Sequence, residues 1–294
     1  MKSAKALTLT YLTSVSFASL NGSDKEADNM SNIKKISVGV EEYPYVSSQA
    51  IRRALRNQLE VLGRELSEGV AASQAKGAAT TRQEPDKFID DDLFGYMGTE
   101  SGDGNTKGGS TKRTSVVRVS PLIALNPYQG DLDFGTNYMG VKAGGDPNIF
   151  ETEIHSGLYR GTILIELDRV GKDESREYID NQEKAARVKD LLKAIKNLWA
   201  SGRQSRFLAD IAPKFVIAAM LSTKNPIFLE SVKLEGNTIN VPIIEETLKD
   251  YEPEIISSVI GMRKGFFAND IVNAKSIGEA FEEMARWIDE YYKQ

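Results

Sequence analysis

Cysteine is absent from this 294-residue chain, and histidine occurs only once, at position 155. The lack of cysteine excludes disulfides, thiolate zinc sites and cysteine nucleophiles. A single histidine excludes a histidine-rich metal site, and nothing around His155 resembles the nucleophile of a serine triad. The composition therefore gives little support to most familiar enzyme chemistries.

Long apolar runs are missing as well. Residues 6–20 follow two lysines and resemble an export signal, but serine and threonine interrupt the segment throughout. Leu7, Leu9 and Tyr11 alternate with threonines, which is the period of a half-buried strand. No segment approaches the ~18 apolar residues of a membrane span. We expect a cytoplasmic protein that does not bind membranes and whose first strand begins almost at residue 1.

A strongly basic surface is also excluded, because the net charge is −5. The charges are nevertheless segregated along the chain. Bases gather at residues 52–56, 107–118 and 203–214, whereas acids gather at 24–28, at 84–92 and in the C-terminal third. This separation allows a basic groove on an acidic body, and it lets copies of the chain meet through opposite charges.

Residues 47–62 predict an amphipathic helix with an unusual polar side. Ser47 is a good N-cap, Gly63 ends the helix, and apolar residues such as Ile51 and Leu55 recur at helical spacing. The opposite side carries Gln49, Arg52, Arg53 and Arg56, and no acid occurs between residues 47 and 58. A solvated surface helix explains this pattern, but a basic face beside a helix N-terminus also holds phosphates.

The order of predicted elements is β-α-β-β-α-β, as in ferredoxin-like RNA-recognition domains. The strands are expected at 6–20, 116–125, 158–170 and 215–221, and the helices at 47–62 and 180–199. Pro121 suggests an edge or a bulge in the second strand. Lys184 and Arg187 are expected on the solvent side of the second helix. The fold class is therefore α+β, with one RRM-like domain over residues 1–294.

Long insertions interrupt this frame at residues 64–115 and 126–157. Within the first, residues 98–112 are glycine-rich and polar, which predicts a mobile loop; the glycines before Lys112 stand in the wrong order for a P-loop. The second insertion has glycines between short apolar pieces, which suits an extended β-ribbon.

The C-terminal residues 226–294 extend the core. Strands are expected near 227–234, 239–241 and 256–262, and a closing helix carries an apolar stripe. That stripe is assigned to the core rather than to a ligand site, and it consists of Ile277, Ala280, Phe281, Met284, Ile288 and Tyr291.

A second basic motif follows the second helix. Gly202 permits a tight turn, and Arg203, Gln204, Ser205 and Arg206 beside it can hold a phosphate by charge and by hydrogen bonds. A helix C-terminus with solvated arginines is the simpler alternative for the motif taken alone. The aromatic motifs of RNA-recognition strands are absent, so base stacking on the sheet is not expected.

Several motifs together resemble the backbone subunit of type I CRISPR Cascade complexes, in the DevR branch of the RAMP superfamily. They cover most of the chain in matching order and lie at residues 43–56, 92–97, 112–121, 151–161 and 202–206. The resemblance implies a modified RNA-recognition fold with a finger-type insertion (64–115) and a thumb-type β-ribbon (126–157). It also implies that several copies stack along one CRISPR RNA.

The resemblance assigns RNA contacts residue by residue. The helix along the guide backbone corresponds to Ser48, Gln49, Arg52, Arg53 and Arg56, and the second contacting loop to Gly202, Arg203, Gln204, Ser205 and Arg206. The RNA-binding set is completed by Asn21 and Gly22 after the first strand, and by Lys112 and Arg113.

The resulting prediction is a non-catalytic scaffold without cofactor, metal or catalytic residue. Its partners would be CRISPR RNA, target DNA through the guide, other copies of itself and other Cascade subunits. One alternative is a metal-dependent endoribonuclease that acts through Asp24, because related type III subunits cut RNA from that loop. Another is a ferredoxin-like metabolic subunit that binds a small anion at residues 202–206.

Overall fold

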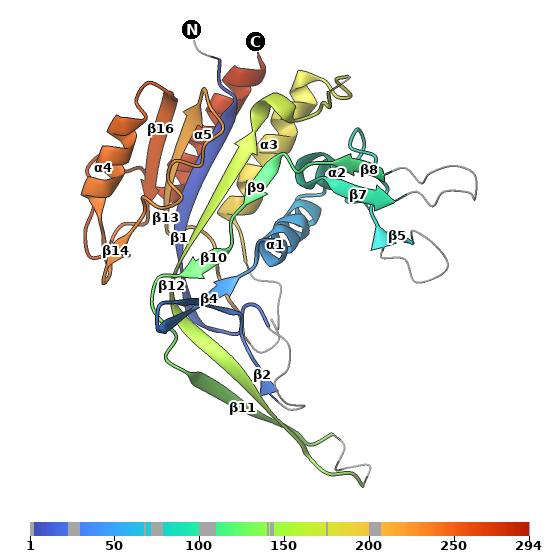
Figure 1. Ribbon diagram of the computed structural model, residues 1–294, viewed down its shortest axis with the longest axis vertical. Coiled ribbons are helices and arrows are strands. Elements are labelled where there is room, and N and C mark those ends of the chain that lie inside the picture. The colour runs from blue at the N-terminus through green and yellow to red at the C-terminus, as the bar shows by residue number, and fades with distance from the viewer. Residues whose placement is uncertain are drawn as a thin grey trace.

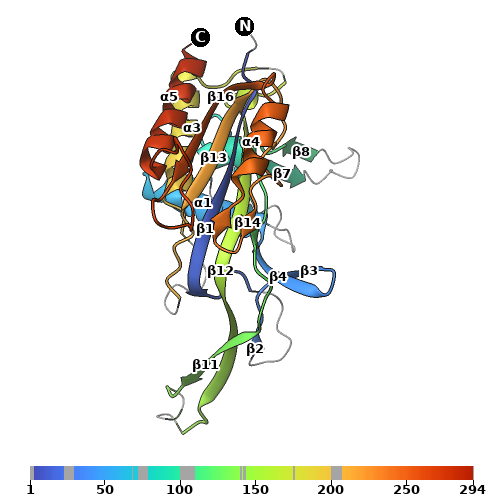
Figure 2. The same cartoon turned by 90° about the vertical axis from the view of Figure 1, so that its left-hand side faces the viewer.

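A computed structural model describes residues 3–22, 30–67, 69–71, 79–99, 110–139, 141, 144–174, 176–199 and 207–293. One large sheet forms the centre of this part of the chain, and helices lie against both of its faces (Figure 1; Figure 2). None of the described helices is both long and apolar enough to cross a lipid bilayer.

The sheet has the strand order β16–β13–β1–β12–β10–β4–β3, and each pair along it is antiparallel. Its central strands are β1 (Ala6–Ala18), β12 (Asn148–Glu166) and β13 (Phe215–Leu221). The strands predicted at 6–20 and 215–221 are thereby confirmed. β13 is buried along its whole length, as its continuous apolar run indicates. One edge is β16 (Ile255–Met262); on the other side lie β10 (Leu122–Ala124), β4 (Glu41–Val46) and β3 (Lys35–Val38).

The strand predicted at 116–125 is two short strands. Both β9 (Val117–Val119) and β10 pair with β12. The strand is interrupted between them at Ser120 and Pro121. Proline lacks the N–H that would continue the ladder, which accounts for the break. The strand predicted at 158–170 is the second half of β12; it ends at Glu166, where the 3-10 turn Leu167–Arg169 begins.

Three helices share one face of the sheet: α1 (Ser48–Val61), α3 (Asn181–Lys196) and α5 (Ile277–Tyr292) (Figure 2). Their apolar sides and the facing side chains of β1 and β13 form the larger of two hydrophobic cores. The predicted start of α1 is confirmed, because the Ser47 side chain accepts a hydrogen bond from the Ala50 N–H at 3.3 Å. Gly63 follows with a φ of +84°, as expected at a helix end.

The polar side of α3 corrects one prediction. Lys184 and Arg187 are buried, with only 3% and 2% of their surface exposed, although they were expected to face solvent. Arg187 donates hydrogen bonds to the Asp92 carboxylate at 2.9 Å and to the Pro85 carbonyl at 2.6 Å. Residues of the 64–115 insertion pack over Arg187, whereas Lys184 lies against residues 170–177. A face that is charged in sequence is therefore an internal contact.

The described residues of the 64–115 insertion form one helix and two small hairpins. The hairpins are β5 (Val70–Ala71) with β6 (Ala79–Thr80), and β7 (Tyr96–Thr99) with β8 (Ser110–Arg113). The segment predicted as a mobile loop begins in β7 and ends in β8, and its residues 100–109 lie outside the described part. Helix α2 (Ile89–Phe94) is buried at all six positions, including its three aspartates.

Residues 126–157, where a ribbon is predicted, contain β11 (Asp131–Asn137) paired antiparallel with the first part of β12. This ribbon projects from the body at the end opposite the two termini (Figure 1). The short strand β2 (Met30–Ser31) lies parallel to β12 near the root of the ribbon.

Residues 226–254 cover the second face of the sheet. A strand predicted at 227–234 is wrong: turns and irregular backbone occupy 227–233, and only Leu234 enters the hairpin of β14 (Leu234–Glu235) and β15 (Thr238–Ile239). Helix α4 (Val241–Asp250) was not predicted, although Asn240 caps it and Pro242 stands in its first turn. Both are helix-start signals. The predicted strand at 256–262 and the closing helix are confirmed by β16 and α5.

The single histidine gives a pH prediction. His155 lies at the ribbon root, its Nδ1 is 2.7 Å from the Tyr159 hydroxyl, and burial lowers the pKa of the imidazole below 6.5. The unfolded chain therefore binds more protons than the folded one just below pH 6.5, so stability is lost as pH falls through that window. We expect the unfolding midpoint to drop by roughly 1–3 °C below its neutral-pH value. Calorimetry should show a smaller drop for His155→Gln; an identical drop would assign the effect to other groups.

Candidate functional site

The basic side of α1 meets α2 and β9. Arg53 and Gln49 are exposed, as predicted, whereas Arg52 and Arg56 are half-buried because these neighbours pack beside them. The structure thus brings five of the predicted residues, Ser48 included, together on one helix, but it gives the arginines different surroundings.

Arg52 is held by backbone rather than by acid. Its guanidinium donates hydrogen bonds to the carbonyls of Phe94 at 3.5 Å and Val117 at 3.3 Å, and it makes no ion pair within the described residues. Burial, together with the charges of Arg56 and Arg118, lowers the pKa of Arg52. The two carbonyls fix the side chain but leave its charge uncompensated, which suits an anion receptor.

Arg56 is positioned by α2. Its Nε lies 3.3 Å from the Asp90 carboxylate, and its guanidinium lies over the Phe94 ring at 4.6 Å. Asp90 is buried and also accepts a hydrogen bond from the Ser67 N–H at 2.9 Å. The sequence placed Asp90 in a run of acids and gave no signal for this contact, because the two residues are far apart in the chain.

Asn21 organises the N-terminus of α1. Its side-chain oxygen accepts a hydrogen bond from the Ser47 N–H at 2.8 Å, and its carbonyl accepts one from the Lys34 N–H at 2.9 Å. Gly22 is exposed, and the hydroxyl of half-buried Ser48 donates to Gln49 at 3.2 Å. Asn21 therefore lies beside the first turn of α1, with Gly22 next to it in the chain; their contact with RNA stays a prediction.

Arg113 requires a correction. It is only 8% exposed, and its guanidinium donates to the Asp92 carboxylate at 2.5 Å and to the carbonyls of Asp92, Arg169 and Lys172. These contacts occupy the donors of the side chain inside the protein, so we remove Arg113 from the RNA-binding set. Lys112, the preceding residue on β8, is exposed.

The second basic motif, Gly202 to Arg206, and the alternative catalytic residue Asp24 lie outside the described residues. A groove of about 590 Å³ lies between the end of α3 and the start of α5. Lys196 and Arg263 line it, and their side chains form no hydrogen bond or ion pair within the described part of the chain. Trp199, at the edge of this groove, is 38% exposed.

The ribbon presents apolar side chains to solvent. The exposed set on and next to it consists of Leu132, Phe134, Tyr138, Met139, Val141 and Ile149. Exposed apolar side chains that gather on one projecting element indicate a candidate contact surface. The sequence pattern predicted the ribbon but not this exposure.

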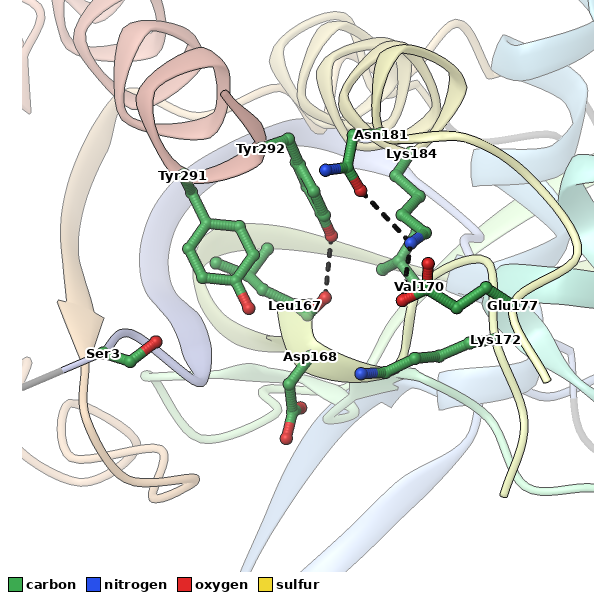
Figure 3. A pocket seen from close by; sticks show the side chains of 10 residues that line it. All are labelled: Ser3, Leu167, Asp168, Val170, Lys172, Glu177, Asn181, Lys184, Tyr291 and Tyr292. Atoms are coloured by element: carbon green, nitrogen blue, oxygen red, sulfur yellow. Dashed lines mark hydrogen bonds and ion pairs between the residues drawn. The ribbon is translucent and has the colours of Figure 1, made fainter. Parts of the chain in front are cut away.

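A small cavity of about 210 Å³ lies elsewhere, between the 3-10 turn, α3 and α5 (Figure 3). Its polar groups largely satisfy one another: Lys184 contacts Glu177 and Asn181, each at 3.2 Å, and the Tyr292 hydroxyl donates to the Leu167 carbonyl at 2.7 Å. None of the predicted RNA-binding residues lines it. The described residues also contain no cluster of three or more acidic or histidine side chains fit to hold a metal.

Comparison with known proteins identifies the family. The sequence model described as "CRISPR-associated negative auto-regulator DevR/Csa2" matches residues 10–241. The "CRISPR-associated protein Cas7/Cst2/DevR" of Myxococcus xanthus (strain DK1622) is 26% identical over 211 residues, which span 67% of this chain and 66% of that protein.

Two solved structures share the fold. A chain of a "CRISPR RNA-guided surveillance complex, pre-nicking" has a TM-score of 0.63 at 14% identity, with 96% of this chain and all of that chain covered. A chain of another "CRISPR RNA-guided surveillance complex" has a TM-score of 0.60 at 16% identity, with 96% and 99% covered. The resemblance drawn from the motifs is thus confirmed: this chain belongs to the DevR/Csa2 family of CRISPR-associated proteins.

Proposed function

We propose that this protein is a non-catalytic scaffold that binds the backbone of CRISPR RNA along α1 and presents the guide for pairing with target DNA. The observation that carries the proposal is Arg52, which backbone carbonyls hold at 3.5 and 3.3 Å and which no carboxylate neutralises in the described chain. Arginine contacts of this kind go to phosphates and ignore sequence, so base pairing would supply the specificity.

The topology supports an RNA-recognition core. The strands β13, β1, β12 and β10 are neighbours in this order, and α1 and α3 occur in the chain where a βαββαβ frame places its helices. A ferredoxin-like core with insertions at 64–115 and 126–157, extended by residues 226–294, is therefore our interpretation of the fold.

The ribbon supports self-association. Its apolar side chains are exposed in the described part of the chain, and a contact between the ribbon of one copy and the body of the next is heterologous. Such contacts repeat along an RNA rather than closing into a dimer. We therefore propose a stack of copies on one CRISPR RNA, joined by other Cascade subunits.

The test is RNA binding over a range of salt concentrations. Arg52→Ala with Arg56→Ala is expected to weaken all RNAs alike, by roughly tenfold or more at low salt, and to flatten the dependence of log affinity on log salt, because fewer counterions are released. Filter binding with several unrelated RNAs measures both quantities. Arg286→Ala, which removes an exposed arginine on α5, is the matched control.

Two outcomes would contradict the proposal. A double variant whose preference among sequences changes would show that these arginines read bases. Cleavage of the labelled RNA in the presence of magnesium, abolished by Asp24→Asn, would favour the endoribonuclease. We expect the RNA to keep its length in both proteins.

A further inference from the structure

The ribbon and the body share a strand whose pairing is irregular where the two meet. Residues 148–154 of β12 pair with β11, and residues from 155 onward pair with β1. The β1–β12 register shifts between Val15 and Ala18, opposite Gly157 and His155. A side chain at Gly157 would lie 2.8 Å from the His155 ring. The backbone pairing between β1 and β12 is therefore weakest at the ribbon root. Contacts other than this pairing must help to fix the ribbon direction.

Glu153 supplies such a contact. It is 6% exposed, and its two carboxylate oxygens accept hydrogen bonds from the Ile33 N–H at 2.8 Å and the Lys35 ammonium at 2.9 Å. Lys35 also lies 4.3 Å from the centre of the Tyr128 ring and 3.6 Å from Glu42. Burial alone would lower the pKa of Lys35, but the hydrogen bond and charge of Glu153 outweigh it, so that the pKa is raised. A buried carboxylate on the ribbon thus holds residues 30–35.

The same segment is tied to α1. Asn21 accepts a hydrogen bond from the Lys34 N–H through its carbonyl at 2.9 Å, and from the Ser47 N–H through its side chain at 2.8 Å. Ser47 is the N-cap of α1. Figure 1 shows β2, the start of this segment, beside the ribbon root and below α1. A continuous path of polar contacts therefore runs from the ribbon through residues 30–35 to the helix N-terminus.

We propose that Glu153 and Asn21 are positioning residues that lock the ribbon to the N-terminus of α1 through residues 30–35. The arginine face and the ribbon are then held at one angle before any RNA is bound. The placement of RNA contacts on these two elements rests on the proposed function, but the lock itself does not.

Because the chain has no cysteine, two introduced cysteines can carry spin labels without background. Labels at Asn137→Cys on the ribbon and Lys249→Cys on α4 report the ribbon direction through their distance distribution. In the free protein we expect one narrow peak. Glu153→Gln should abolish that single peak. Asn21→Ala, which removes the bond from Ser47 but keeps the backbone bond from Lys34, should broaden it. Glu151→Gln, which removes the same charge two residues away, should leave it unchanged.

A single narrow peak in Glu153→Gln would overturn the proposal whatever the RNA-binding result. Lys35→Met keeps the Ile33 hydrogen bond and gives a milder test if Glu153→Gln does not fold; it should broaden the peak. A second readout separates positioning from misfolding: Glu153→Gln should bind a short RNA within roughly twofold of the parent protein but lose cooperative assembly on a long one. If Glu153→Gln loses affinity for the short RNA as much as it loses assembly on the long RNA, then Glu153 has a merely structural role.

Discussion

An Asp92→Asn variant is expected to lose about 3–5 kcal/mol of unfolding free energy, because two buried arginines would lose their shared counter-charge. Asp92 is fully buried and pairs with Arg113 at 2.5 Å and Arg187 at 2.9 Å. It also accepts hydrogen bonds from the Tyr178 hydroxyl at 2.8 Å and the Gly171 N–H at 3.2 Å. Urea unfolding followed by circular dichroism measures the loss.

Asp86→Asn is the matched control, because Asp86 is an exposed acid in the same insertion. A loss below about 1 kcal/mol in Asp92→Asn would show that the two arginines find other partners. The variant should also weaken RNA binding, since Asp92 anchors α2 and α2 holds Arg52 and Arg56. If Asp92→Asn is less stable but binds RNA with unchanged affinity, then α2 does not contribute to the RNA-binding face.

Shortening the ribbon is expected to abolish long assemblies while leaving the body folded. Thr136 and Ile149 are paired across the ribbon, so residues 137–148 can be replaced by Asn-Gly, which favours a two-residue hairpin turn. The change removes exposed apolar residues such as Tyr138 and Met139 and no residue of either hydrophobic core. Assembly on RNAs of graded length should need roughly tenfold more protein or more, because each copy loses a neighbour contact.

Light scattering on the same RNA series measures this loss. Ile36→Ser on the exposed hairpin of β3 and β4 is a control that removes apolar surface elsewhere. Loss of cooperative thermal unfolding in the shortened protein would show that the ribbon is structural. Unchanged assembly would place the contact between copies on another surface.

Local patterns predicted the elements that depend on local physics. The periodicity of α1, its Ser47 cap and the apolar run of β13 are each encoded within a few residues, and the structure contains them where expected. Helix α4 carries comparable start signals at Asn240 and Pro242, but short apolar runs around it also suited strands.

The roles of charged residues could not be predicted in the same way. Arg113 and Arg187 resemble surface cations in sequence, yet both are buried and pair with Asp92, which is distant in the chain. Asp90 likewise meets Arg56 only because α2 folds back against α1. Such pairs depend on where an insertion packs, and no local pattern records that. Motif resemblance found the helix with Arg52, but not the carbonyls that hold its side chain.

β12 runs without interruption for 19 residues from the projecting ribbon to the far end of the sheet, whereas most strands have fewer than about ten. At about 3.3 Å per residue, the seven residues that pair with β11 reach roughly 23 Å beyond the body, so a tilt of about 5° at the root moves the tip by about 2 Å. Residues 155–166 of the same strand lie in the sheet and set the direction in which the ribbon continues. A change of side-chain volume at buried Ile154, which lies at the root, should therefore displace the tip more than the root itself, and it would alter the spacing between neighbouring copies in the proposed stack.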